Sequence, residues 1–89
     1  MTGPRVSVEP LGGDRYRVRV GVGVATEHEV TATAAVLARV ARDGETPEVT
    51  VARAFGFLLD REPAQSILRR FALEDIARYF PEFWDVMNA

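Results

Sequence analysis

The chain has no cysteine and no lysine, since all eleven of its basic residues are arginines. Without cysteine it cannot form disulfides, thiolate nucleophiles or cysteine metal sites. Without lysine it has neither a Schiff-base amine nor the lysine that reaches the phosphates in a nucleotide-binding P-loop. These absences remove several enzyme classes and fit a reducing compartment.

Long hydrophobic runs and a large excess of one charge are also missing. The longest apolar stretches, 20–25 and 54–59, are far shorter than the roughly 18 residues of a membrane-spanning helix. The N-terminus does not show the basic-then-apolar pattern of a signal peptide. The net charge of −2 gives no overall attraction to nucleic acid or to an anionic membrane. We therefore expect a cytoplasmic domain without a membrane partner.

What the sequence does contain is sufficient for one folded domain. Its 89 residues are 47% hydrophobic and 27% charged, as in ordinary globular proteins. A chain of this length buries roughly 60–70% of its surface, which allows one core but leaves little room for an enclosed cavity. We predict a single small α+β domain over residues 1–89, in which any ligand site is shallow or at an interface.

Alternation of hydrophobic and polar residues in the first third of the chain predicts β-strands. Between Arg15 and Val24, tyrosine and valines fall on one side while arginines and glycines fall on the other. We predict strands at about 4–9, 14–22 and 26–32, joined as an antiparallel meander with turns at 10–13 and 22–24. Matching valine with valine across the strands fixes the register. The predicted opposite pairs are Val8 with Tyr16, Glu9 with Arg15, Arg17 with Glu29, and Arg19 with Glu27.

The remainder of the chain carries helix signals. We predict helices at about 34–42, 47–61, 63–70 and 74–80, and a last helical turn at 82–87. Thr31 or Thr33 suits the cap of the first helix, and Thr46 followed by a proline suits the start of the second. Pro63 separates the second helix from the third.

The second predicted helix is apolar on more than one face, so we expect it to be central and mostly buried. Gly56 in its interior lowers helix stability, which suggests that the backbone of the sheet passes close by. The predicted fold class is therefore α+β: an N-terminal three-stranded antiparallel β-meander packed on one face by three to four short C-terminal helices.

The sequence offers little for catalysis. His28 is the only histidine, and without cysteine it cannot form an ordinary transition-metal site. We expect it to be partly buried and hydrogen-bonded, with a functional histidine as the alternative, because base catalysis also needs a nucleophile and an oxyanion donor within reach. We predict no catalytic, cofactor-binding or metal-binding residues, and hence no enzyme.

The aromatic C-terminus is the main candidate surface. Four aromatic residues lie within 79–84, and although most belong in the core, they cannot all point inward from a short helix. Tyr79, Phe83 and Trp84 are therefore possible interface residues of the hot-spot type. We predict a non-catalytic domain that acts through protein–protein association, as a homo-oligomer or an accessory subunit, through these aromatics or the sheet edge.

The second strand offers a less favoured alternative. Arg15, Arg17 and Arg19 project from one face of the predicted sheet, where arginines could meet the phosphates of a nucleic acid. The alternative function is thus a nucleic-acid-binding or regulatory protein. The same face also carries Glu9, Glu27 and Glu29, so the sequence leaves open whether the arginines bind phosphate or only pair with these glutamates.

The segment 57–82 follows the pattern FLLxREPxxSILxxFxLxxIxxYFPE. This run resembles a group of small uncharacterised bacterial and archaeal proteins that have a variable, strand-rich front. The resemblance implies only the fold, strands followed by helices, and assigns no activity, cofactor or catalytic residue. Within the pattern, packing alone does not explain Arg61, Glu62, Ser66 and Tyr79, and we expect the first three to form a structural junction between helices.

Overall fold

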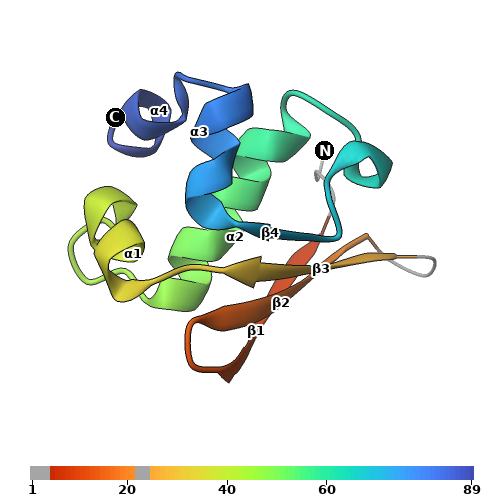
Figure 1. Ribbon diagram of the computed structural model, residues 1–89, viewed down its shortest axis with the longest axis horizontal. Helices are drawn as coiled ribbons and strands as arrows, with labels where there is room; N and C mark the ends of the chain where they lie inside the picture. Colours follow the sequence, from red (N-terminus) through yellow and green to blue (C-terminus); the bar gives the residue numbers. More distant parts are fainter. Residues whose placement is uncertain (1–4, 22–24) are drawn as a thin grey trace.

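A mixed four-stranded sheet and four α-helices form two layers in the computed structural model, which describes residues 5–21 and 25–89 (Figure 1). The strands, in their order across the sheet, are β1 (Val6–Gly12), β2 (Arg15–Val20), β3 (Thr26–Thr31) and β4 (Arg70–Ala72). The helices are α1 (Ala34–Val40), α2 (Pro47–Leu59), α3 (Ile76–Tyr79) and α4 (Phe83–Met87), with 3-10 turns η1 (Ala64–Ser66) and η2 (Leu73–Asp75). The α+β class is as the sequence predicts.

The antiparallel meander β1–β2–β3 is present, and the register of its second hairpin is confirmed. Arg17 lies opposite Glu29 and Val18 opposite His28. The even-numbered residues of β2 are buried while the odd-numbered ones are exposed, because successive side chains alternate across a strand. The predicted turn at 22–24 and the outer ends of the strands predicted from residue 4 and to residue 22 lie outside the described residues.

The first hairpin pairs two residues further along than the sequence suggested. Val8 lies opposite Val18 and Glu9 opposite Arg17, where we had expected Tyr16 and Arg15. The predicted turn at 10–13 begins too early, because β1 continues to Gly12 through an irregularity between Pro10 and Gly12. Positive φ angles of 97° at Gly12 and 59° at Gly13 then allow a tight turn, a conformation that glycine adopts without steric cost.

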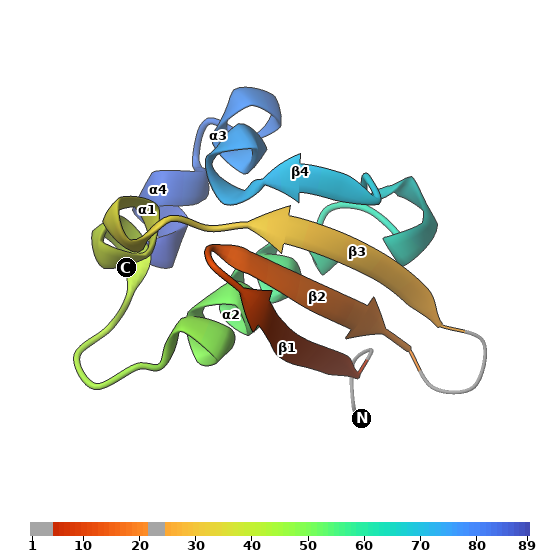
Figure 2. The same ribbon diagram turned by 60° about the horizontal axis from the view of Figure 1, so that its bottom comes forward.

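The helix predicted at 63–70 is wrong. Only the single turn η1 follows Pro63, and Ile67 is extended, with φ −75° and ψ 133°. The chain then forms β4, a fourth strand that runs parallel to β3 (Figure 2). Tertiary hydrogen bonds replace the helical ones here, since the Glu29 N–H donates to the Arg69 carbonyl at 2.7 Å.

The other helices lie near their predicted positions but are shorter. Thr33 and Thr46 cap α1 and α2 by accepting hydrogen bonds from backbone N–H groups two or three positions into each helix. α1 ends at Val40 because Ala41 is extended, and the segment predicted at 74–80 begins as the 3-10 turn η2 before α3. None of the helices in the described part of the chain is long and apolar enough to cross a membrane.

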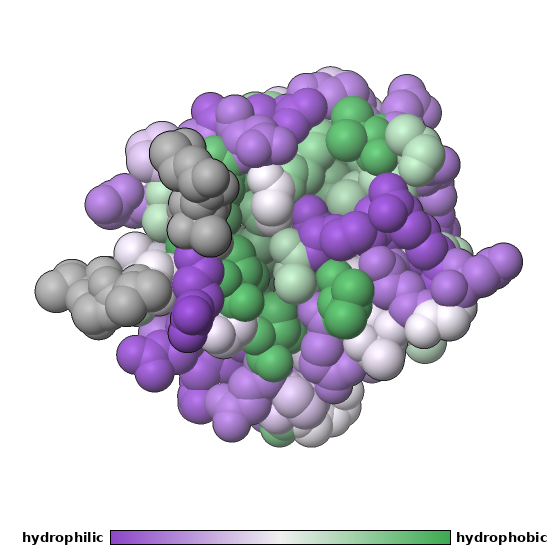
Figure 3. Space-filling view, turned by 180° about the vertical axis from the view of Figure 1, so that it is seen from behind, coloured by the Kyte–Doolittle hydropathy of each residue, from purple (hydrophilic) through white to green (hydrophobic). Residues whose placement is uncertain are grey.

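The core lies between the inner face of the sheet and α2. Phe55 of α2 is fully buried, and its ring centroid lies 5.4 Å from that of His28 and 5.9 Å from that of Phe71. β1 also packs against α2, where Val6 and Val8 are half-buried. Seen from behind, hydrophobic residues reach the surface between hydrophilic ones (Figure 3).

An ion pair between Glu45 and Arg53 ties the helices together. The Glu45 side chain is 7% exposed, and both of its oxygens accept hydrogen bonds from the Arg53 guanidinium. The same guanidinium donates to the carbonyls of Val40 in α1 at 2.7 Å and of Met87 in α4 at 3.2 Å. One half-buried side chain on α2 therefore holds the ends of two neighbouring helices, a role that no local sequence pattern indicates.

The hydrogen bonds from Arg53 lower the pKa of Glu45 from 4.5 to about 2, against the opposing effect of burial, with further donors at the Arg42 N–H and the Thr50 hydroxyl. Because folding lowers this pKa, the stabilisation is complete above about pH 4.5 and is lost as the pH falls toward 2.

We predict that Glu45→Gln lowers the free energy of unfolding near neutral pH by about 3 kcal/mol, and that its difference from the wild type shrinks as the pH falls. Urea unfolding at a series of pH values measures this. Glu27→Gln, which removes an exposed carboxylate, is the control and should change stability little. A Glu45 difference that is constant with pH would contradict the assignment.

The surroundings of Gly56 differ from those that the sequence suggested. It is exposed on α2, and a Cβ built on it would meet nothing within 4 Å, so no neighbouring backbone requires a glycine. Our expectation that the backbone of the sheet passes close to Gly56 is therefore wrong.

Because glycine costs a helix about 1 kcal/mol relative to alanine, Gly56→Ala should raise the free energy of unfolding by about that amount. Gly44 is the matched control: it also has open space, but its φ of +76° disfavours any side chain. Gly44→Ala should therefore destabilise the protein by about 1 kcal/mol. Chemical denaturation of both variants tests the pair, and a loss of stability in Gly56→Ala would show that the position has a constraint of another kind.

Candidate functional site

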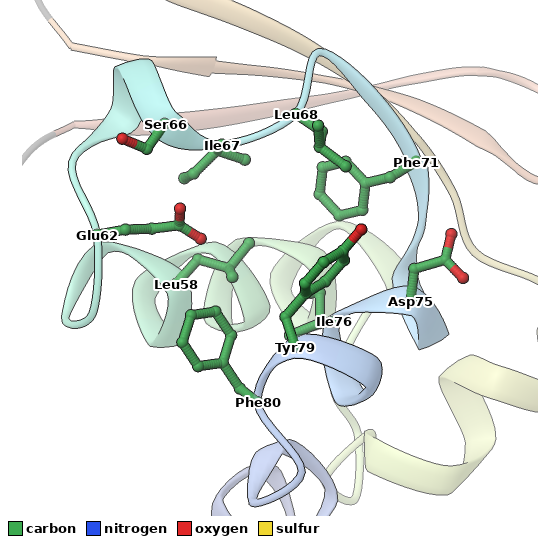
Figure 4. A pocket seen from close by; sticks show the side chains of 10 residues that line it. All are labelled: Leu58, Glu62, Ser66, Ile67, Leu68, Phe71, Asp75, Ile76, Tyr79 and Phe80. Carbon is green, nitrogen blue, oxygen red and sulfur yellow. The ribbon is translucent and has the colours of Figure 1, made fainter.

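An apolar groove of about 220 Å³ opens between the C-terminal end of α2, the segment that leads into β4, and α3 (Figure 4). Its apolar lining consists of Leu58, Ile67, Leu68, Phe71, Ile76 and Phe80. Leu58, Ile67 and Ile76 are buried and belong to the core. The groove is thus a hollow in which the core reaches the surface.

Two large side chains at the groove remain exposed. Leu68 is 54% exposed and Tyr79 is 69% exposed. Tyr79 extends from α3 toward the side of the groove formed by Leu68 and Phe71 (Figure 4). In the described part of the chain the other large exposed hydrophobic residues, Val49 and Val86, do not line this groove.

Polar groups without internal partners border the groove. Glu62, Ser66 and Tyr79 line it, and within the described residues none of their side chains forms a hydrogen bond or an ion pair. The Glu62 carboxylate points into the groove from the end of α2 (Figure 4). Asp75, on the opposite side, is occupied, because it accepts a hydrogen bond from the Ala72 N–H at 3.2 Å.

His28 holds the wall of the groove in place. Its Nδ1 lies 2.8 Å from the Leu68 carbonyl and its Nε2 lies 2.9 Å from the Thr26 hydroxyl. Since a carbonyl only accepts, Nδ1 carries the proton that is donated to Leu68. His28 is hydrogen-bonded, as we expected, but at 3% exposed it is more deeply buried than the partly buried histidine of the prediction. It fixes the backbone of Leu68, whose side chain borders the groove.

The predicted junction residues separate into two roles. Arg61 is structural: it donates to the Glu82 carboxylate at 3.0 Å and to the Phe57 carbonyl at 3.1 Å, with its guanidinium 3.6 Å from the centroid of the Phe57 ring. The pKa of the Glu82 carboxyl is lowered, first by a hydrogen bond from the backbone N–H of Glu82 itself and then by the hydrogen bond from Arg61. Glu62 and Ser66 instead belong to the groove.

The predicted aromatic interface is divided in the same way. Tyr79 is exposed at the groove, whereas Phe83 is fully buried and its side chain is not available as a surface anchor. Trp84 is half-buried, and the Arg39 guanidinium lies 3.8 Å from its ring centroid. Phe83 points inward because α4 packs on α1, α2 and α3 at once.

The arginines of β2 are paired. Arg17 lies 2.8 Å from Glu9, Arg19 lies 3.3 Å from Glu27, and Arg15 lies 3.7 Å from Glu29. A shallow hollow beside them also includes Arg69 and Arg70. The ion-pair ladder that the sequence offered as one of two explanations is therefore present, and it reduces the positive potential of this face.

The edges of the sheet are protected. β1 contains Pro10, which has no N–H to offer to an added strand. β4 has three residues, and its Ala72 N–H donates to the Asp75 carboxylate. Both features limit pairing with another strand, so the groove is a better candidate for binding than either edge.

Among the described residues there is no group of three or more histidine, aspartate or glutamate side chains arranged to hold a metal ion. Comparison of the chain with protein-family models, with curated proteins and with solved structures finds no match. The resemblance of the segment 57–82 to a protein group therefore stays a prediction.

We predict that His28→Phe lowers the free energy of unfolding by about 1–3 kcal/mol, because the Leu68 carbonyl loses its donor. Hydrogen exchange at Leu68–Ala72 should become faster in this variant. Thr26→Val removes only the second partner of the ring and should have the smaller effect. Unchanged exchange in His28→Phe would mean that the histidine does not hold this segment.

Proposed function

We propose that the groove is a docking site through which this domain binds an apolar side chain of a partner protein. The proposal rests on one observation: the exposed side chains of Leu68 and Tyr79 flank an apolar hollow, and the side chains of Glu62 and Ser66 at its border have no internal partner among the described residues. The predicted class of function, association without catalysis, is kept, but of the predicted contacts Tyr79, Phe83, Trp84 and the sheet edge only Tyr79 belongs to the groove.

The size of the groove supports a side chain as the ligand. Its volume of about 220 Å³ is below the roughly 300–1,000 Å³ of typical small-molecule sites. A leucine, methionine or phenylalanine anchor needs less space than a cofactor. Burying such a side chain contributes about 1.5–3 kcal/mol to the free energy of binding. The bound side chain would at the same time cover the exposed part of Leu68.

The polar groups support a peptide rather than a purely apolar ligand. The Ser66 and Tyr79 hydroxyls both donate and accept hydrogen bonds, and both line the groove. A backbone amide beside the anchor could pair with either hydroxyl. An apolar pocket with a few polar groups at its border is the usual form of a specific binding site.

We do not propose nucleic-acid binding as a second function. Each of Arg15, Arg17 and Arg19 has a glutamate within ion-pair distance, so a phosphate would have to compete with that carboxylate. That the domain is non-catalytic and cytoplasmic stays a prediction of the sequence.

The test selects binding peptides from a random display library on the immobilised full chain and measures their affinities by fluorescence polarisation. We predict that Leu68→Ser and Tyr79→Ser each weaken binding about fivefold or more, because about 1 kcal/mol of apolar contact is lost. Val49→Ser and Val86→Ser are matched controls at exposed hydrophobic positions away from the groove and should leave the affinity unchanged.

Urea unfolding of the four variants separates loss of binding from loss of folding. A library that enriches no peptide above the blank surface would contradict the proposal. So would peptides that bind the Leu68→Ser variant as tightly as the wild type.

A further inference from the structure

We infer that the partner segment is cationic, with an arginine or lysine next to the apolar side chain that enters the groove. The inference rests on the proposed docking function. It concerns the carboxylate of Glu62, which points into an otherwise apolar hollow (Figure 4).

Glu62 lacks the cation that a carboxylate beside apolar side chains normally has. It is half-buried, and no ion pair or hydrogen bond to its side chain is found in the described ranges. A carboxylate next to an apolar surface gains from a cation because the local dielectric constant is lower than in bulk water. The missing cation is therefore one that a partner can supply.

Arg61 and Arg78, the arginines next to Glu62 and Asp75, are already paired, and Arg69 and Arg70 line the shallow hollow beside β2 instead of the groove. Arg61 follows α2 directly before Glu62, but it turns away to pair with Glu82. Arg78 of α3 lies 3.8 Å from Asp75, on the other side of the groove. Within residues 5–21 and 25–89, the charged residues that line the groove are thus Glu62 and Asp75, both carboxylates.

This charge distribution selects among partners. An acidic segment would be repelled by the Glu62 carboxylate, and a neutral one would bury Glu62 without compensation. A segment with a cation beside its anchor satisfies Glu62 while the apolar side chain covers Leu68. Complementary charge at the border of an apolar contact sets specificity and orientation more than affinity.

The experiment pans the random peptide library against the wild-type chain and the Glu62→Arg variant in parallel. Peptides selected on the wild type are expected to carry arginine or lysine beside a large apolar residue. Peptides selected on Glu62→Arg are expected to carry aspartate or glutamate there instead. Enrichment of apolar anchors without any preference for basic neighbours would overturn the inference.

Affinities of the selected peptide give the second measurement. Glu62→Gln, which keeps the shape and removes the charge, should weaken binding about two- to fivefold at low salt, and high salt should remove the difference. Glu27→Gln, on the opposite face of the sheet and paired with Arg19, is the control and should have no effect.

The two proposals fail in different ways. If Leu68→Ser weakens binding and Glu62→Gln does not, the groove is a docking site but its partner is not selected by charge. If neither variant changes binding, the docking function itself is wrong. Dimerisation of the wild type in analytical ultracentrifugation that is lost in Leu68→Ser would assign the groove to a second copy of this chain and overturn the inference.

Discussion

The pairing of β4 with β3 is the constraint on which the groove depends. The Arg69 carbonyl accepts a hydrogen bond from Glu29 in β3, and the Leu68 carbonyl accepts one from the buried ring of His28. These contacts hold the chain extended where its local sequence favoured a helix. A helix at this point would have placed Leu68 and Phe71 on one buried face. As a strand, the segment leaves Leu68 exposed at the border of a hollow.

β2, β3 and α2 could be predicted from the sequence because their signals are local. Alternation sets the faces of β2, and Thr46 with Pro47 starts α2 where the structure begins it. β4 could not be predicted in this way, because its partner β3 lies about forty residues earlier and no local pattern reports that contact. The same limit applies to Arg53, whose role depends on carbonyls at the ends of α1 and α4.

The candidate site was only partly visible for a related reason. The sequence marked Arg61, Glu62, Ser66 and Tyr79 as polar residues that packing does not explain, and the last three line the groove. The sequence did not predict that these residues lie at one groove, because it predicted a helix at 63–70, where the structure has the turn η1 and the start of β4. Charge pairing then distinguishes the groove from the arginine-bearing face of β2: the arginines of β2 have glutamate partners, whereas Glu62 has no cation among the described residues.

The most direct test of the account is to map a selected peptide onto the full chain by the amide chemical shifts of the labelled protein. We expect the largest changes at Glu62 and in two stretches that border the groove from different sides, 66–71 at the entry to β4 and 76–80 in and just after α3. Shift changes confined to β1 and β2, or to α4 around Trp84, would contradict this expectation, because the peptide would then bind a different surface.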